Sequence, residues 1–151
     1  MVKINKLIIE FLLFYAASIF GEAVFTKLVL ALYPGLKEEV MMDLSDFSLI
    51  NLASSLVISP FVETVILVYS IYIGSQVIKD SRYCLAFSVI PICLIHIVVF
   101  WQLAFVVFPL FYIQGMAYGV FRKKVNRNAA IILVTALHFV FNLSGILLAL
   151  W

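Results

Sequence analysis

Four polar side chains lie inside long apolar stretches of this sequence, where acid–base chemistry would be shielded from bulk water: Glu63, His96, His138 and Asn142. An ionisable residue in a membrane span costs roughly 2.5–3.5 kcal/mol even on lenient insertion scales, so each needs a reason to be there. A carboxylate removed from water is a stronger base, and a histidine can share a water and move its proton. A His/Asn pair can donate hydrogen bonds to a developing oxyanion. Together these residue types predict hydrolysis of an amide bond within the membrane.

These side chains are also expected to lie at a common depth. Counting about 1.5 Å per residue from the basic inner ends of the helices places Glu63 and Glu22 roughly 24 Å up, and His96 and Asn142 roughly 21 Å up. His138 lies one turn below Asn142, and their i, i+4 spacing puts both on one helix face. Buried polar groups need partners, and groups in one layer can supply them to each other. The sequence therefore predicts one buried polar layer in the outer half of the bilayer.

The same residues are open to other interpretations. Two histidines on separate helices can ligate a haem axially, although His96 and His138 differ in depth by about 7 Å. Glu63 and the two histidines also form a His₂Glu set of the kind that binds zinc. Glu63 could instead be a structural, hydrogen-bonded acid. Cys93 lies three residues before His96, but no basic residue nearby would activate its thiol, so we interpret it as a packing residue.

The composition indicates that lipid is the solvent of this chain. Of the 151 residues, 66% are hydrophobic and 12% are charged, against about half and a quarter in a soluble domain. A span needs roughly 20 apolar residues, so the chain has room for about five spans and short connections. The net charge is only +2, and the basic residues lie in loops between apolar runs. Both features argue against a nucleic-acid partner. Cys84 and Cys93 fall within one apolar run and cannot bridge each other.

Five helices are expected to position the polar residues, in an all-α, polytopic transmembrane bundle formed by the single domain 1–151. A Tyr-Pro-Gly sequence ends the first helix, and the polar stretch 37–46 is expected to be a loop. The apolar stretch 47–58 is short and is predicted to be interfacial or re-entrant. Ser59-Pro60 favours a helix start, because proline fits the first turn. The expected helices are Leu7–Leu32, Pro60–Ile78, Tyr83–Phe100, Leu103–Phe121 and Ala129–Trp151.

The basic residues predict the orientation of the bundle. With the N-terminus inside, the inner segments hold eight Lys and Arg residues, whereas the outer segments hold Lys37 alone, among four acids. This distribution follows the positive-inside rule, and five spans then leave the C-terminus outside. If the stretch 47–58 crosses the membrane with its neighbour, the number of spans is even instead. The small size of the chain suits a prokaryotic inner or plasma membrane.

Four ordered motifs carry a resemblance to a known family. The first is "PFVET" with Glu63, the second is "CLIHIVVF" with His96, and the third is "FYIQGMAYGVFRKK", in which Gly-x-x-x-Gly precedes basic residues. The fourth is "HFVFN", which begins at His138 and ends at Asn142. In this order and spacing they resemble the CPBP family, the type II CAAX prenyl endopeptidase and Abi family of intramembrane proteases.

The resemblance implies a glutamate-dependent peptidase that uses no metal and no other cofactor. It covers roughly residues 59–145, which would form the catalytic core. Carried over from the family, Glu63 and His96 would activate water, while His138 and Asn142 would stabilise the oxyanion.

The sequence departs from the family pattern within the first motif. Thr64 occupies the position of a second glutamate, and Val68 that of an arginine. Thr64 is therefore an auxiliary candidate, and we hypothesise that Glu22, expected at matching depth, replaces the missing carboxylate. In the third motif, Gly115 and Gly119 share a helix face, and we interpret them as packing residues that let another helix approach closely.

The expected partner is a hydrophobic peptide or a membrane-anchored protein within the lipid bilayer. Because the predicted polar layer lies toward the outer face, an exported substrate would fit better than a cytosolic prenylated one. A C-terminal membrane anchor or a peptide precursor is the substrate that we expect. The alternative is a catalytically silent protein of the same fold, which binds a hydrophobic helix for immunity or assembly.

Overall fold

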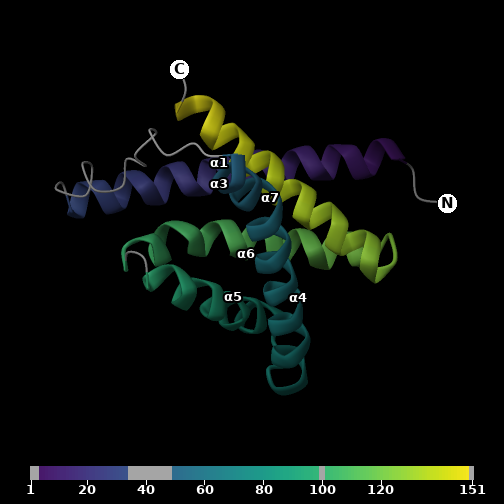
Figure 1. Cartoon of the computed structure of the whole chain (residues 1–151). Helices are drawn as coiled ribbons and strands as arrows, with labels where there is room; N and C mark the ends of the chain where they lie inside the picture. Colours follow the sequence, from purple (N-terminus) through teal and green to yellow (C-terminus); the bar gives the residue numbers. More distant parts are fainter. Residues whose placement is uncertain (1–3, 34–48, 99–100, 150–151) are drawn as a thin grey trace.

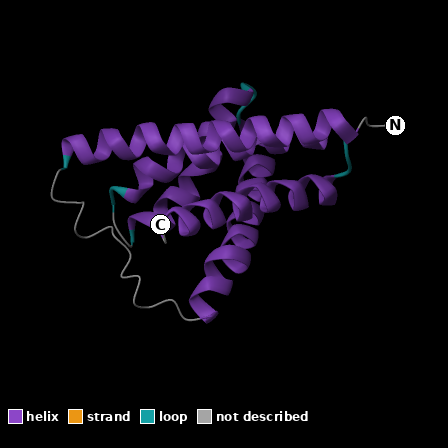
Figure 2. Ribbon diagram, turned by 90° about the horizontal axis from the view of Figure 1, so that it is seen from above, coloured by secondary structure: helices purple, strands orange, loops and turns teal. Residues whose placement is uncertain are grey.

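A computed structural model describes residues 4–33, 49–98 and 101–149 of the chain. Every regular element in these ranges is a helix (Figure 1, Figure 2), which confirms the predicted all-α bundle. The predicted loop 37–46 lies outside the described residues. The elements are α1 (Ile4–Leu32), α3 (Leu49–Ala53), the π-helical turn η2 (Ser54–Ile58), α4 (Ser59–Val77), α5 (Ser81–Ile97), α6 (Leu103–Arg122) and α7 (Arg127–Ala149).

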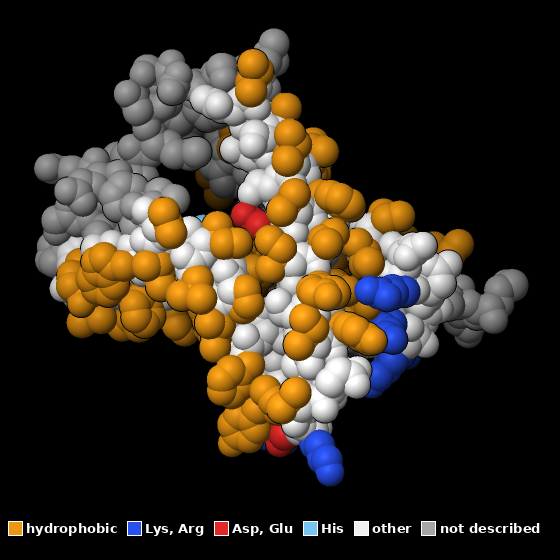
Figure 3. All heavy atoms as spheres, turned by 60° about the horizontal axis from the view of Figure 1, so that its bottom comes forward, with side chains coloured by type: hydrophobic (Ala, Val, Ile, Leu, Met, Phe, Trp, Pro, Cys, Tyr) orange, Lys and Arg blue, Asp and Glu red, His pale blue; other side chains and the backbone are white. Residues whose placement is uncertain are grey.

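The helices have the length and the surface of membrane spans. Large apolar side chains are exposed along α1, α4, α5, α6 and α7, and they dominate the face seen in Figure 3. A soluble protein would bury such a surface, so the chain is a membrane protein. The fifth apolar helix, α5, has 17 residues and is about 25 Å long, a little short of the ~30 Å hydrocarbon core. Among the described residues, four helices are long and apolar enough to cross a membrane, namely Ile4–Leu32, Ile50–Val77, Leu103–Arg122 and Arg127–Leu148.

Helix α6 forms the centre of the bundle, where it contacts α1, α4, α5 and α7. Figure 1 shows α1 running alongside α6, while α4 crosses both steeply. One apolar cluster surrounds Phe121 and Leu137, toward the C-terminal half of α6. A second cluster surrounds Phe111 and Ile92, toward its N-terminal half. These two clusters fix the relative positions of the helices that carry the polar residues.

The helix that carries Glu63 begins where the sequence predicts, but a further helical segment precedes it. Helix α4 starts at Ser59 with Pro60 in its first turn, and the described part of the stretch 47–58 is helical from Leu49 and continues directly into α4. An interfacial or re-entrant position of this stretch stays a prediction. Pro60 has no N–H, and in a regular α-helix its ring would clash with the carbonyl four residues earlier. In η2 the chain widens just before the proline, where the N–H of residue 59 donates to the carbonyl of residue 54. The π turn thus accommodates Pro60 inside one long helix.

The other helix ends agree with the prediction to within a few residues. Helix α5 begins at Ser81 because Asp80 caps it, accepting a hydrogen bond from the backbone N–H of Arg82 at 2.8 Å. The predicted ends of the third and fifth helices, at residues 99–100 and 150–151, lie outside the described residues. A polar side chain thus positions the start of the helix that carries His96.

The two glycines of α6 have different surroundings. A Cβ on Gly115 would lie 2.3 Å from Leu85 Cδ1, so the absence of a side chain at Gly115 leaves room for the Leu85 side chain of α5 to pack against α6. A Cβ on Gly119 would meet no heavy atom of the described residues within 4 Å. The prediction of close packing at Gly119 is therefore wrong, because this position faces open space.

Candidate functional site

One cavity of about 360 Å³ gathers the polar residues that the sequence places in a common layer. Glu22, Glu63, His96, His138 and Asn142 all line it, although they come from α1, α4, α5 and α7. The structure therefore brings these five side chains together around one space. Its other lining residues are Ser55, Ser59, Val107, Leu110, Phe111, Phe141, Gly145 and Ile146.

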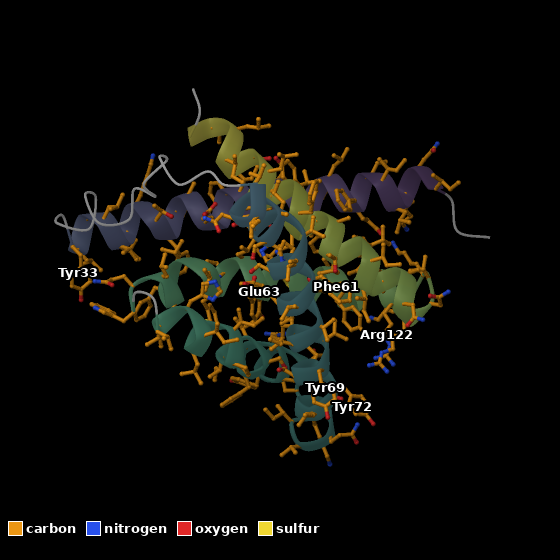
Figure 4. The ribbon with its side chains drawn as sticks, in the orientation of Figure 1. Tyr33, Phe61, Glu63, Tyr69, Tyr72 and Arg122 are labelled. Carbon is orange, nitrogen blue, oxygen red and sulfur yellow. The ribbon has the colours of Figure 1, made fainter. Side chains whose placement is uncertain are left out.

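Glu63 lies between two imidazole rings. Its Oε1 is 3.9 Å from His96 Nε2, and its Oε2 is 3.6 Å from His138 Nε2. Both separations exceed direct hydrogen-bonding distance. Ser59, one turn earlier on the helix, donates its hydroxyl to Oε1 at 2.6 Å and so orients the carboxylate. Figure 4 shows Glu63 in the middle of the bundle, whereas Tyr72 extends outward near the far end of α4.

The tautomer of His96 is set by its own helix. Its Nδ1 lies 2.9 Å from the carbonyl oxygen of Ile92, four residues earlier. A carbonyl can only accept, so Nδ1 carries the proton, and the neutral ring presents a lone pair at Nε2. That lone pair faces Glu63 Oε1. Two acceptors therefore face each other across 3.9 Å, an arrangement that suits a molecule with two protons to donate.

His138 is more deeply buried than His96. Only 3% of its surface is exposed, and its ring meets that of Phe111 edge to face with centroids 5.2 Å apart. Its Nδ1 is buried and has no hydrogen-bond partner among the described residues. Unlike His96, His138 is not held in one tautomer by a backbone carbonyl. It can therefore present a proton at Nε2, toward Glu63.

The side chain of Asn142 is held by a backbone carbonyl that has no hydrogen-bond donor within its own helix. Its Nδ2 donates to the carbonyl oxygen of Ser55 at 2.9 Å. In the π register of η2, this carbonyl would pair with the N–H of residue 60, which is a proline and has none. The side chain of Asn142 supplies the missing donor. Its second amide proton stays free of this bond.

Two serines belong to the site although the sequence analysis did not single them out. Ser59 orients Glu63 through its hydroxyl, and Ser55 anchors Asn142 through its backbone carbonyl. Their spacing could have identified both serines from the sequence, because residues four and eight positions before Glu63 lie toward the same helix face. Both serines also line the cavity.

The two auxiliary candidates differ in position. Glu22 lines the cavity from α1 and makes no hydrogen bond or ion pair within the described part of the chain. Thr64 is fully buried and does not line the cavity. Its hydroxyl has no partner among the described residues. Val68, at the position of the family's arginine, is a core residue.

The arrangement gives little support to the rival metal and haem interpretations. Within the described ranges, no group of three or more His, Cys, Asp and Glu side chains is arranged to hold a metal ion. Glu63 occupies the space between the two histidines that axial ligation of a haem would require. The thiol of Cys93 is directed to the carbonyl of Ala104 at 3.5 Å. These observations leave the carboxylate and its two imidazoles as the chemistry to explain.

Comparison with known proteins finds no relative of this chain. No protein-family model matches it, and neither a curated protein nor a solved structure matches it. The chemistry of the cavity is therefore inferred from its own geometry and from the order of the sequence motifs.

Proposed function

We propose that the protein is an intramembrane endopeptidase in which Glu63 activates a water molecule. The observation that carries this proposal is the position of Glu63 between His96 and His138, in a cavity that five helices enclose. Within the described part of the chain, no Lys or Arg neutralises this carboxylate, which leaves it available to accept a proton. The resemblance of four ordered motifs to the CPBP family supports the same reaction.

Glu63 and His96 are arranged to bind the attacking water. Oε1 and Nε2 are two acceptors 3.9 Å apart, and a single water can bridge them by donating one proton to each. As the water oxygen forms a bond to the peptide carbonyl carbon, Glu63 takes one of its protons and the carbonyl electrons move to the oxygen. Breakage of the C–N bond then releases the amine, which receives the proton from Glu63.

His138 and Asn142 are proposed to stabilise the oxyanion formed in that step. A proton on His138 Nε2 and the second amide proton of Asn142 are two donors on one face of α7. Asn142 is already oriented by its bond to Ser55, so little reorganisation accompanies the reaction. Glu22, on the opposite helix, is proposed as an auxiliary carboxylate at the edge of the cavity.

The proposed substrate is a hydrophobic peptide segment within the bilayer. Apolar side chains of α6 and α7 form much of the cavity wall, for example Leu110 and Ile146, and such walls suit an apolar ligand. A C-terminal membrane anchor or a peptide precursor, approached near the outer face, has this character. The proposed location is the inner or plasma membrane of a prokaryotic cell, with the N-terminus inside.

The test compares Glu63→Gln with Glu10→Gln in purified protein offered a set of fluorogenic anchor peptides. Both variants lose one carboxylate from an apolar helix, but Glu10 does not line the cavity and pairs instead with Lys124. Loss of a general base typically lowers the rate about 10²–10⁴-fold. We expect this loss for Glu63→Gln alone, with thermal unfolding showing both variants folded. Equal cleavage by Glu63→Gln and the wild type would refute the role of Glu63.

One observation favours a second candidate, a silent peptide-binding protein. Thr64 and Val68, at the positions of the family's second glutamate and arginine, are both buried away from the cavity. If the wild type binds the peptides without cleaving any, and Glu63→Gln binds them equally, the protein is a binding module.

A further inference from the structure

A second cavity, of about 600 Å³, lies where α4 ends, α5 begins and α6 ends. No residue lines both this cavity and the candidate site. Its walls are mainly apolar, with Phe14, Ile71, Leu85, Tyr112, Met116 and Val120 among the lining residues. Three cationic side chains line it as well: Lys79, Arg82 and Lys123. The cavity therefore combines an apolar interior with a concentration of positive charge.

The three cations are not neutralised within the described part of the chain. None of Lys79, Arg82 and Lys123 forms an ion pair there, and no acidic side chain lines the cavity. Asp80 is close in sequence, but its carboxylate accepts the backbone N–H of Arg82 as a helix cap. Figure 3 shows Lys and Arg side chains at the right and lower edges of one face, with an acidic side chain beside those at the lower edge. Cations converging on one apolar space favour an anionic ligand.

The dimensions of the cavity match one leaflet of a bilayer. Its lining on α6 runs from Tyr112 to Lys123, a length of about 16 Å. Half of the ~30 Å hydrocarbon core is about 15 Å. The space beside Gly119, where a Cβ would meet no atom of the described residues within 4 Å, adds room along the same helix face. An acyl chain therefore fits along α6, with its headgroup at the basic end.

We propose that this cavity is a binding site for an anionic phospholipid of the inner leaflet. The phosphate would contact Lys79, Arg82 and Lys123, and one acyl chain would lie against Tyr112 and Met116. Basic pockets between transmembrane helices bind anionic headgroups in this manner, and an Arg guanidinium can hold a phosphate through two hydrogen bonds. The inference is independent of the proposed peptidase activity, because the two sites share no residue.

The test measures thermal unfolding of the full chain in detergent with added phosphatidylglycerol, phosphatidylcholine or inorganic phosphate. Retained lipid is counted by native mass spectrometry. We expect phosphatidylglycerol to raise the Tm about 5 °C more than phosphatidylcholine, as a ligand well above its Kd would. Inorganic phosphate should give no such shift, since it has no acyl chain to bury. An equal shift with inorganic phosphate would contradict the lipid assignment, and so would the absence of a phosphatidylglycerol effect.

Two sets of variants test the contacts to the headgroup and the contacts to the acyl chain separately. The triple variant Lys79→Gln/Arg82→Gln/Lys123→Gln should lose the preference for phosphatidylglycerol. The matched triple variant Lys6→Gln/Lys27→Gln/Arg127→Gln changes the net charge equally but spares the cavity, and it should keep the preference. A Cβ at position 119 would meet no heavy atom of the described residues within 4 Å, so we expect Gly119→Leu to fold, to extend into the cavity and to retain no lipid. The proposal is wrong if the matched variant loses the preference as much, or if Gly119→Leu retains lipid undiminished.

Discussion

The surroundings of Glu63 depend on a proline three residues before it. Pro60 has no N–H, so the carbonyl of Ser55 has no partner in the π register of the helix. Asn142 donates to that carbonyl from α7, and this bond holds α7 against η2, just before α4. The same helix face then presents Ser59 and Glu63 to the cavity. The backbone N–H that Pro60 lacks thus links the position of Glu63 to that of Asn142.

The contact between Asn142 and Ser55 predicts energetic coupling between Asn142 and Pro60. Asn142→Ala leaves the partly buried carbonyl of Ser55 without this donor, which should lower the free energy of unfolding by about 1 kcal/mol. In a Pro60→Ala background, residue 60 regains an N–H that can reach Ser55, so the same change should be milder. We expect a coupling energy of at least about 0.5 kcal/mol. The four proteins of this double-mutant cycle are the wild type, the two single variants and the double variant. Reversible unfolding by SDS in mixed micelles measures the free energy of unfolding of each.

The control for this cycle is an asparagine on the same helix outside the site. Asn128 is exposed, so Asn128→Ala should change the free energy of unfolding by less than about 0.5 kcal/mol in either background. Strictly additive effects of Asn142→Ala and Pro60→Ala would show that the proline and the amide act independently.

At this scale, the sequence identifies residues that are costly to place in a membrane and misses those that are not. Glu63, His96 and His138 stand out because a titratable group in an apolar run needs a partner. Ser55 and Ser59 do not stand out, since serine is tolerated in apolar helices and can bond to its own backbone. The role of Ser55 arises from its carbonyl, which becomes available only when the π turn forms.

At the scale of elements, apolar run length and local signals predict most of the helices, but not the helical segment before Ser59. Ser59-Pro60 is a favourable start by local rules, and α4 does begin at Ser59, but it continues the helical segment from Leu49 without a break. Local rules do not foresee this continuation, because the carbonyl of Ser55 is paired by Asn142 from α7. Such a contact between residues 55 and 142 is absent from any local pattern.

The two glycines of α6 provide a matched test of helix packing. Gly115→Leu would force a side chain into Leu85, since even a Cβ there lies 2.3 Å from Cδ1. We expect this overpacking to cost about 1–3 kcal/mol. At Gly119 a Cβ would meet no heavy atom of the described residues within 4 Å, and leucine favours a helix more than glycine does, so Gly119→Leu should be as stable as the wild type or slightly more so.

Unfolding by SDS in mixed micelles, without added anionic lipid, compares the two variants. A second change, Leu85→Ala, should restore much of the stability lost in Gly115→Leu, because it removes the side chain that the new residue meets. Equal destabilisation by Gly115→Leu and Gly119→Leu would contradict the difference in their surroundings.

At the scale of the whole molecule, the two cavities occupy opposite ends of the same helices. On α5, His96 near the C-terminal end lines the polar cavity, whereas Arg82 near the start lines the basic one. On α4, Glu63 near the start lines the polar cavity, whereas Ser75 near the end lines the basic one. If the basic end faces the cytoplasm, as the positive-inside rule predicts, the polar cavity lies toward the outer face. The side from which the proposed substrate would arrive therefore depends on the topology of α5.

The topology itself is testable, because α5 is the shortest of the apolar helices. At about 25 Å it spans a bilayer only if the membrane thins slightly or its ends reach the interface. We predict that α5 crosses, so that Ser81 lies inside and Gln102 lies outside.

In a chain whose two native cysteines are replaced by alanine, Gln102→Cys should react with a membrane-impermeant maleimide on intact cells. Ser81→Cys and Arg127→Cys should react only after permeabilisation. Labelling of Ser81→Cys and Gln102→Cys from the same side would contradict the crossing of α5, and with it the proposed approach of the substrate from the outer face.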